Sequence, residues 1–197
     1  FHYESAALLE KMAVRIYQKL QKHTHAAEAC LAAAEITDQM VRLDDSEKWC
    51  QLALEELSLD TEKVHDELSG KIRMRLGYVF FRQAKWDKTI TAYRDACACF
   101  EACGNTEKQI EVMVLWGNAL RNATDYPDAL ALFQKIETMP SYETLREKNA
   151  PLFLNFLLYY GWTHHSACHY TAASSYLEAA EELLSSCENL VPNKDIA

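Results

Sequence analysis

Apolar residues recur at three- and four-residue steps along most of the chain, the spacing that places side chains on one face of an α-helix. In the first seventy residues the pattern predicts amphipathic helices at 4–22, 24–40 and 46–57. The stretch "VLWGNALRNATDYPDALALF", residues 114–133, keeps helical spacing through Gly117, which is therefore predicted inside a helix. A helical glycine costs about 1 kcal/mol relative to alanine, so packing there must require the absence of a side chain.

Gly77, Gly117 and Gly161 lie 40 and 44 residues apart and share their surroundings. A large residue precedes each glycine, an aromatic residue follows nine positions later, a small residue twelve positions later and a large residue sixteen positions later. The preceding large residues are Leu76, Trp116 and Tyr160, and the aromatic residues are Trp86, Tyr126 and Tyr170. The small residues are Thr89, Ala129 and Ala173, and the large residues sixteen positions later are Tyr93, Phe133 and Leu177. The chain therefore contains an internal repeat over about 71–184. The first seventy residues have no glycine at the expected place, so one and a half or two divergent repeats are both open there.

Start and turn signals agree with this repeat. Tyr126 followed by Pro127 predicts a helix start, because proline is tolerated in the first helical turn. Thr61 before acidic residues predicts the start of the helix that contains Gly77, and Asn149 with Pro151 predicts the start of the helix that contains Gly161. Gly104 and Asn105 predict a turn.

This repeating pattern, a large residue before glycine followed by an aromatic, a small and a large residue, resembles the tetratricopeptide repeat. The spacing is similar to the roughly 40-residue form in kinesin light chains, LGN-like polarity adaptors and some bacterial regulators. The resemblance implies an all-α fold in which antiparallel helix-turn-helix units stack into a right-handed α-solenoid, with the glycines where the two helices of a unit cross. We expect one domain over 1–197, with degenerate repeats at 1–60. Repeats are expected at 61–102, 105–139 and 143–187, followed by a polar tail at 188–197.

Composition narrows the function. The net charge of −9 argues against nucleic acid as a partner, and five glycines with four prolines leave few turn residues for sheets. Seven cysteines, an odd number placed mostly in helical patterns, indicate free thiols and a cytoplasmic protein, with the nucleus as the alternative. The apolar stretch 151–162 is shorter than the roughly 20 residues of a membrane span. The chain begins at Phe1 rather than at methionine, which indicates a piece of a longer protein.

Two clusters invite a metal interpretation. These are "HHSACH" at 164–169 and the thiols of Cys97, Cys99 and Cys103. Four convergent ligands are not evident in either, so we expect packed side chains, no metal and no cofactor. Phosphate-loop, nucleophile-elbow and zinc-protease motifs are missing from the sequence, and we expect no enzymatic activity.

The resemblance also implies a binding surface, because the first helices of successive repeats line a concave groove. Groove positions lie six and three residues before each glycine and one, four and five after it. These positions and their basic neighbours give a predicted partner-binding set of Lys71, Arg75, Tyr78, Arg82, Asn118, Arg121, Asn122, Asn155, Trp162 and His165.

A basic groove that carries asparagines would suit an acidic or C-terminal peptide, since arginine binds carboxylates and asparagine binds peptide backbone. We therefore predict an adaptor or scaffold that binds a linear segment of a partner protein, without membrane insertion. The alternative is a structural subunit of a larger assembly or a SNAP-like trafficking factor.

Overall fold

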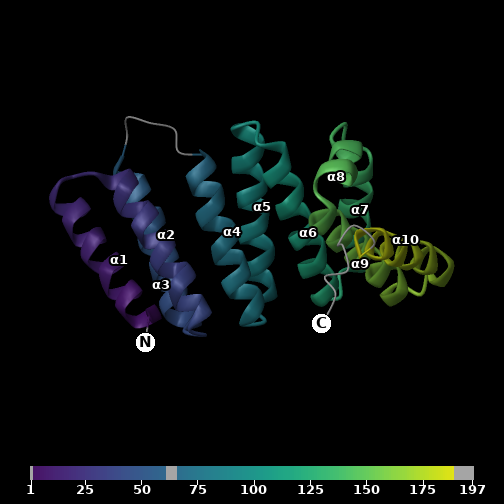
Figure 1. The fold of residues 1–197 in the computed structure, drawn as a ribbon, viewed down its shortest axis with the longest axis horizontal. Helices are drawn as coiled ribbons and strands as arrows, with labels where there is room; N and C mark the ends of the chain where they lie inside the picture. Colours follow the sequence, from purple (N-terminus) through teal and green to yellow (C-terminus); the bar gives the residue numbers. More distant parts are fainter. Residues whose placement is uncertain (1, 61–65, 189–197) are drawn as a thin grey trace, which may run out of the picture. The chain divides into compact units, whose positions relative to one another are not determined.

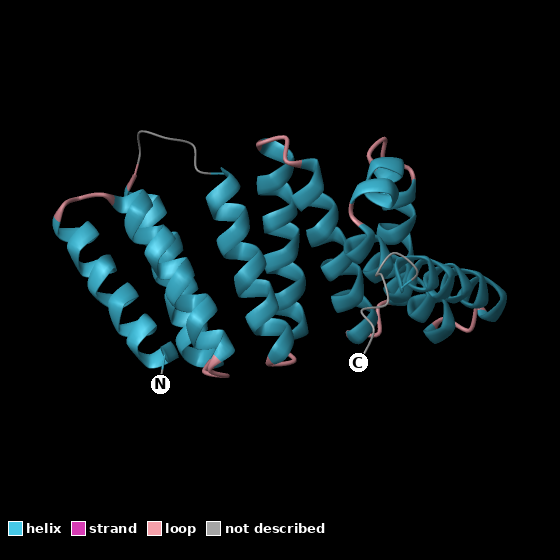
Figure 2. Ribbon diagram, in the orientation of Figure 1, coloured by secondary structure: helices cyan, strands magenta, loops and turns pink. Residues whose placement is uncertain are grey.

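A computed structural model describes residues 2–60 and 66–188, which form ten α-helices and no strand (Figure 2). The predicted all-α repeat class is therefore confirmed. The helices are α1 (His2–Lys19), α2 (His23–Gln39), α3 (Leu43–Leu59), α4 (Asp66–Arg82), α5 (Trp86–Ala102), α6 (Thr106–Asn122), α7 (Tyr126–Glu137), α8 (Tyr142–Lys148), α9 (Ala150–Ser166) and α10 (Tyr170–Glu188) (Figure 1).

The chain divides into two compact units, Phe1–Val112 and Met113–Ala197. The first unit holds α1 to α5 with the beginning of α6, and the second holds the rest of α6 with α7 to α10. The single domain over 1–197 and the repeat bounds stay predictions. Thr61, expected to start a helix, lies outside the described residues, as does the expected tail from 189 onward.

In the first unit, α2 with α3 and α4 with α5 form antiparallel hairpins. Tight turns at 40–42 and 83–85 connect the helices of each pair, and each turn has one residue in the left-handed region, Val41 at φ 60° and Ala84 at φ 54°. Left-handed backbone at a helix end lets the chain reverse within a few residues. The two hairpins lie side by side, with α1 packed on α2 (Figure 1).

The glycines lie where the helices of a hairpin cross. A Cβ added to Gly77 would lie 2.6 Å from the ring of Tyr93, and one added to Gly70 would lie 2.9 Å from the ring of Phe100. Both rings are nearly or fully buried, at 1% and 0% exposure. Each ring of α5 therefore occupies the space that a side chain on α4 would otherwise fill.

The first hairpin follows the same register with different residues. Ala34 stands where the later hairpins have glycine, and Ser46 and Cys50 follow it by twelve and sixteen positions. All three are fully buried, and the Ser46 hydroxyl donates a hydrogen bond to the Ala34 carbonyl oxygen at 2.8 Å. Alanine is accommodated because the facing side chain is a small thiol instead of an aromatic ring. The first seventy residues thus contain one hairpin preceded by the single helix α1.

The amphipathic pattern of α1 is not fully used for packing. Val14 is buried on α2 and belongs to the core, but Leu9, Met12, Ile16 and Leu20 are 65%, 51%, 53% and 58% exposed. This row lies on the face of α1 opposite Val14. It remains uncovered by the described residues.

Aromatic side chains form the core of the second unit. Added Cβ atoms on Gly117 and Gly161 would lie 2.5 Å from Phe133 and 3.0 Å from Leu177. The Phe133 ring stacks on Tyr160 with 5.2 Å between centroids. The short helix α8, which the repeat pattern did not predict, lies between α7 and α9 and places Tyr142 against Phe156 at 5.7 Å. This insertion accounts for the longer spacing of 44 residues between the last two glycines.

The helix starts in this unit follow the sequence signals. α7 begins at Tyr126, and the Asp125 carboxylate accepts a hydrogen bond from the Asp128 amide. α9 begins after Asn149, whose side-chain oxygen accepts from the Leu152 amide at 3.2 Å. Such caps satisfy amide groups that have no partner within the helix.

We predict that Gly117→Leu lowers the free energy of unfolding by about 1 to 3 kcal/mol, because its side chain would have to displace the buried Phe133 ring. Urea unfolding followed by circular dichroism measures the change. Ala131→Leu, an exposed helical position on α7, is the control and should shift stability by less than about 0.5 kcal/mol. Equal stability of the two variants would contradict the crossing.

The thiols should differ in reactivity, because only the thiolate is nucleophilic. Burial raises the pKa of Cys30 and of Cys50 to about 12, whereas Cys103 and Cys168 are exposed. At pH 8 a disulfide reagent should label Cys103 and Cys168 in the native protein and reach Cys30 and Cys50 only after unfolding. Mass spectrometry of trapped peptides identifies the sites, and early labelling of Cys50 would disprove its burial.

Candidate functional site

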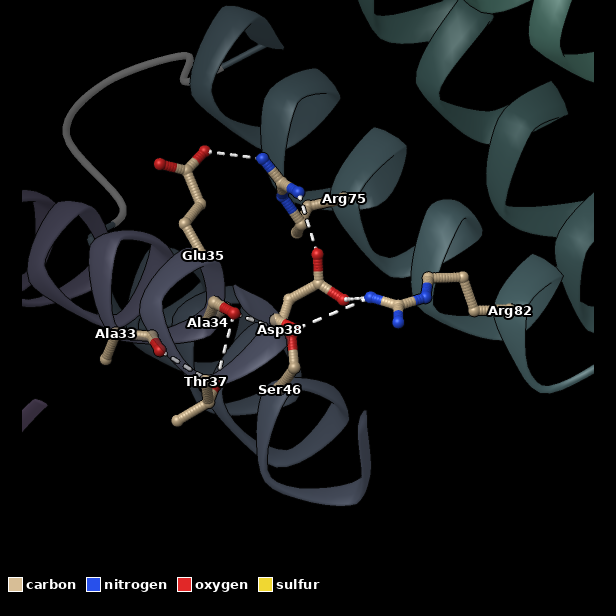
Figure 3. Close-up of polar contacts among 8 residues, drawn as sticks. All are labelled: Ala33, Ala34, Glu35, Thr37, Asp38, Ser46, Arg75 and Arg82. Carbon is tan, nitrogen blue, oxygen red and sulfur yellow. Dashed lines mark hydrogen bonds and ion pairs between the residues drawn. The ribbon is translucent and has the colours of Figure 1, made fainter. Parts of the chain in front are cut away.

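The predicted groove residues of the first unit form a cluster that we call the α2–α4 arginine cluster, made of Arg75, Tyr78 and Arg82 on α4 with Glu35 and Asp38 on α2. Figure 3 shows the two arginines and the two acids. The α4 residues lie at i, i+3 and i+7, so they share one helix face. Arg82 Nη1 donates to Asp38 Oδ1 at 2.6 Å. Arg75 lies 2.9 Å from Glu35 Oε1 and 3.6 Å from Asp38 Oδ2.

Arg75 and Arg82 stabilise the negative charge of Asp38. Its side chain is only 8% exposed, and it lies in the last turn of α2, where the helix dipole disfavours negative charge. Two guanidinium groups offset both costs, and neighbouring hydrogen bonds from Thr37 to Ala33 and from Ser46 to Ala34 complete the local network (Figure 3). Arg75 and Arg82 therefore tie the second hairpin to the first.

The same contacts correct the expectation of a basic groove over this unit. Arg75 and Arg82 also lie near the ring of Tyr78, with 5.7 Å and 5.9 Å from Cζ to the centroid. Lys71 pairs with Glu67 at 2.7 Å, one turn earlier on α4. All three cations have carboxylate partners within the chain, so this surface holds little free positive charge.

The predicted groove residues of the second unit form what we call the α6–α9 arginine site, made of Asn118, Arg121 and Asn122 on α6 with Trp162 on α9. The Asn118 side-chain oxygen accepts from Arg121 Nε at 3.3 Å and Nη2 at 2.8 Å. Asn122 Nδ2 donates to the Asn118 main-chain oxygen at 2.7 Å. The buried asparagine thus fixes the guanidinium in one orientation.

Arg121 differs from Arg75 and Arg82, because none of the described residues places a carboxylate within ion-pair distance of it. Its guanidinium carbon lies 5.8 Å from the ring centroid of Trp162, which is 42% exposed. Desolvation by burial lowers the pKa of Arg121, while nearby Tyr159 and Tyr126 act in the opposite direction. The result is a half-buried cation held by neutral amide and aromatic groups.

The remaining predicted residues of this unit lie further along α9. His165 contacts Tyr170 edge to face at 5.6 Å, and Asn155 is exposed two turns before Trp162. His164 stacks on Tyr160 at 4.6 Å and approaches His169, with 3.4 Å between the two Nδ1 atoms. Over residues 2–60 and 66–188, no group of three or more histidine, cysteine or acidic side chains is placed to hold a metal ion.

Comparison with solved structures decides the fold family. The protein BtubC (BKLC) from P. vanneervenii superimposes with a TM-score of 0.83 over all of this chain and 78% of its own, at 17% identity. A P. anserina protein described as a kinesin light chain with nearly identical TPR-like repeats gives 0.76 over 95% of this chain and 89% of its own, at 11% identity. The protein MamA gives 0.62 over 89% of each chain, at 16% identity.

The chain has the tetratricopeptide-repeat-like fold. No protein-family model and no curated protein sequence matches it, so the likeness concerns the fold and not the partners. None of the helices in the described part of this TPR-like chain is both long and apolar enough to cross a membrane.

Sequence reasoning missed Glu35 and Asp38, the residues that decide the charge of the first unit. A signal for them existed. If Ala34 is taken as the first crossing residue of the TPR-like array, the positions one and four residues later are Glu35 and Asp38. Because the positions one and four residues after a crossing residue are groove positions, both acids are then expected on the same surface as Arg75 and Arg82.

We predict that Asp38 and Arg82 are coupled in stability. A double-mutant cycle of Asp38→Ala and Arg82→Ala should give a coupling free energy of about 1 to 2 kcal/mol by urea unfolding. Asp38→Ala leaves Arg82 without its carboxylate partner, and Arg82→Ala leaves the buried Asp38 with the more distant Arg75 alone. The exposed pair Glu67 and Lys71 is the control, with an expected coupling of about 0.3 to 0.5 kcal/mol. Equal coupling in both cycles would contradict the role of Asp38.

Proposed function

We propose that the chain is a non-catalytic protein-interaction module, an adaptor or scaffold, whose α6–α9 arginine site binds a linear peptide segment that carries a carboxylate. One observation carries the proposal: Arg121 is half-buried, oriented by Asn118, and has no carboxylate partner among the described residues. A partner carboxylate would supply the missing counter-ion.

The surroundings of Arg121 suit such a guest. A desolvated guanidinium gains more from a carboxylate than an exposed one does, and it can bind both oxygens at once. Trp162 offers an exposed aromatic face beside it, and Asn155 and Asn122 offer amide groups that can bond the backbone of an extended peptide. Affinity would come from the ion pair and the aromatic contact, and the amides would orient the peptide.

This site is narrower than the groove expected from the sequence. Arg75 and Arg82 are occupied by Glu35 and Asp38, so they contribute to stability and to the fixed geometry of α4. We therefore assign partner binding to Asn118, Arg121, Asn122, Asn155, Trp162 and His165. Lys71, Arg75, Tyr78 and Arg82 are left out of the proposed contact surface.

No enzyme family is indicated by the comparisons, and the proposal requires no cofactor and no nucleic acid. The cysteines at 30, 50, 97, 99, 103 and 168 form no disulfide among the described residues, which suits the reducing cytoplasm or nucleus. The partner is accordingly expected among the proteins of those compartments.

The exposed row of α1 favours a second candidate, a structural subunit whose outer helix is covered in a larger assembly. Leu9, Met12, Ile16 and Leu20 form a larger apolar surface than single scattered exposed residues. Under this alternative the isolated chain should aggregate or require a stoichiometric partner. A monodisperse monomer in light scattering at about 100 µM would favour the adaptor.

We predict that Arg121→Gln weakens binding of a fluorescein-labelled ten-residue peptide with alternating glutamates and a free C-terminus by about tenfold or more, equivalent to about 1.4 kcal/mol. Fluorescence polarisation measures the affinity. Trp162→Ala should also weaken it, while Arg146→Gln on α8, an exposed arginine outside the site, should not. The matched peptide with glutamine for glutamate and an amidated end should bind weakly to every variant.

Unchanged binding of the acidic peptide by Arg121→Gln would refute the site. So would equal binding of the glutamate and glutamine peptides by the wild-type chain, because the proposal requires a carboxylate. Circular dichroism melting of each variant shows whether the fold is intact, so that loss of binding is not confused with unfolding.

A further inference from the structure

The first unit contains a groove that the proposed function does not use. It lies between α1 and α3, with a volume of about 600 Å³, in the size range of sites that enclose a substantial ligand surface. From α1 it is lined by Glu4, Ala7, Leu8 and Lys11, and from α3 by Asp45, Lys48, Trp49 and Leu52. Thr37 and Arg42, at the end of α2 and the start of α3, close one end.

The lining residues share one spacing. On both helices they stand at i, i+3, i+4 and i+7, so each helix presents one continuous face to the groove. α1 and α3 both run antiparallel to α2 and are therefore parallel to each other (Figure 1). Seven residues of helix span about 10 Å, so the lining residues extend over about two turns of each helix. This shape fits an amphipathic helix laid between two helices.

The floor of the groove is apolar. Leu8 is 59% exposed although it lies in a concave position, and Trp49 and Leu52 are half-buried beside it. Each loses further contact with water if an apolar side chain occupies the groove. The rim carries the charged residues.

The rim carries a lysine from each helix, Lys48 near the start of α3 and Lys11 two turns along α1. Asp45 is already paired with Arg42 at 2.5 Å and lies 3.7 Å from Lys48, whose side chain is 74% exposed. Lys11 has no hydrogen-bond or ion-pair partner among the described residues, and Glu4 lies two turns away along α1. In a chain of net charge −9, these two lysines favour a partner that places carboxylates beside each of them.

We propose that the α1–α3 groove binds an amphipathic helix of a partner protein, with large apolar residues at i, i+3, i+4 and i+7 and acidic residues that face Lys11 and Lys48. The apolar residues cover Leu8, Trp49 and Leu52, and the carboxylates pair with the two lysines. This surface is separate from the α6–α9 arginine site, so the chain has two docking surfaces of different chemistry.

The test uses a fluorescein-labelled 14-residue helical peptide with leucines at positions 3, 6, 7 and 10 and glutamates at the flanking positions. The complete 197-residue chain should bind it saturably in fluorescence polarisation. Lys11→Glu should weaken binding by about fivefold or more, and Leu8→Asp by about tenfold or more. Lys19→Glu, an exposed lysine on the same helix outside the groove, is the matched control and should change affinity by less than about twofold.

Two further peptides separate the contributions. Replacement of the glutamates by glutamine should weaken binding several-fold and remove most of its salt dependence, and replacement of the leucines by alanine should abolish it. The effects of Lys11→Glu and Leu8→Asp should persist in the Arg121→Gln background, which makes failure of this proposal distinguishable from failure of the α6–α9 site. Leu8 and Lys11 are exposed, so these variants should retain wild-type melting temperatures.

Several outcomes overturn the proposal. These are absence of saturable binding, equal effects of Lys11→Glu and Lys19→Glu, equal affinity for the glutamate and glutamine peptides, and absence of the Lys11→Glu and Leu8→Asp effects in the Arg121→Gln background. Self-association of the wild-type chain that Leu8→Asp abolishes, in sedimentation experiments without peptide, would assign the groove to a second copy of the chain instead.

Discussion

The helix crossing within each hairpin is the constraint on which the rest of this structure depends. A side chain too small to separate two helices faces one large enough to fill the space, as with Gly77 and Tyr93 or Gly117 and Phe133. The close approach fixes the angle between the helices, and that angle fixes which face of the first helix remains uncovered. The position of every candidate binding residue on α4, α6 and α9 follows from this packing.

Uncovered faces with the same register carry different chemistry in the two units. On α4, Arg75 and Arg82 form ion pairs with Glu35 and Asp38. These ion pairs stabilise the contact between adjacent hairpins within the chain. On α6 the nearest acceptor of Arg121 is the amide of Asn118, which orients the guanidinium without neutralising it. Arg121 is available to a partner because none of the described residues offers it a carboxylate.

The repeat class could be predicted from the sequence because glycine and aromatic residues at fixed spacing report a local packing requirement. The sequence predicts the helices α2 and α3 but leaves their pairing open. At their crossing Ala34 faces the small side chain of Cys50, whereas the later crossings pair glycine with a larger side chain. α8 escaped notice because it forms between two well-marked elements and is only 7 residues long. The sequence pattern indicated which residues lie on the candidate surfaces, but not which of their charges are neutralised within the chain. Whether Arg82 has an ion-pair partner depends on Asp38, 44 residues away.

Net charge and local charge act over different distances. In solution at physiological ionic strength the field of the −9 chain is screened within about 8 Å. Beyond that distance an acidic segment feels little of the net charge, and at contact the adjacent Arg121, or Lys11 and Lys48, act on it more strongly than carboxylates further away. Because Arg121 is half-buried, its attraction to a carboxylate is screened less than that of an exposed lysine. Added salt should therefore weaken association with the lysine rim of the α1–α3 groove more strongly than association with the α6–α9 arginine site.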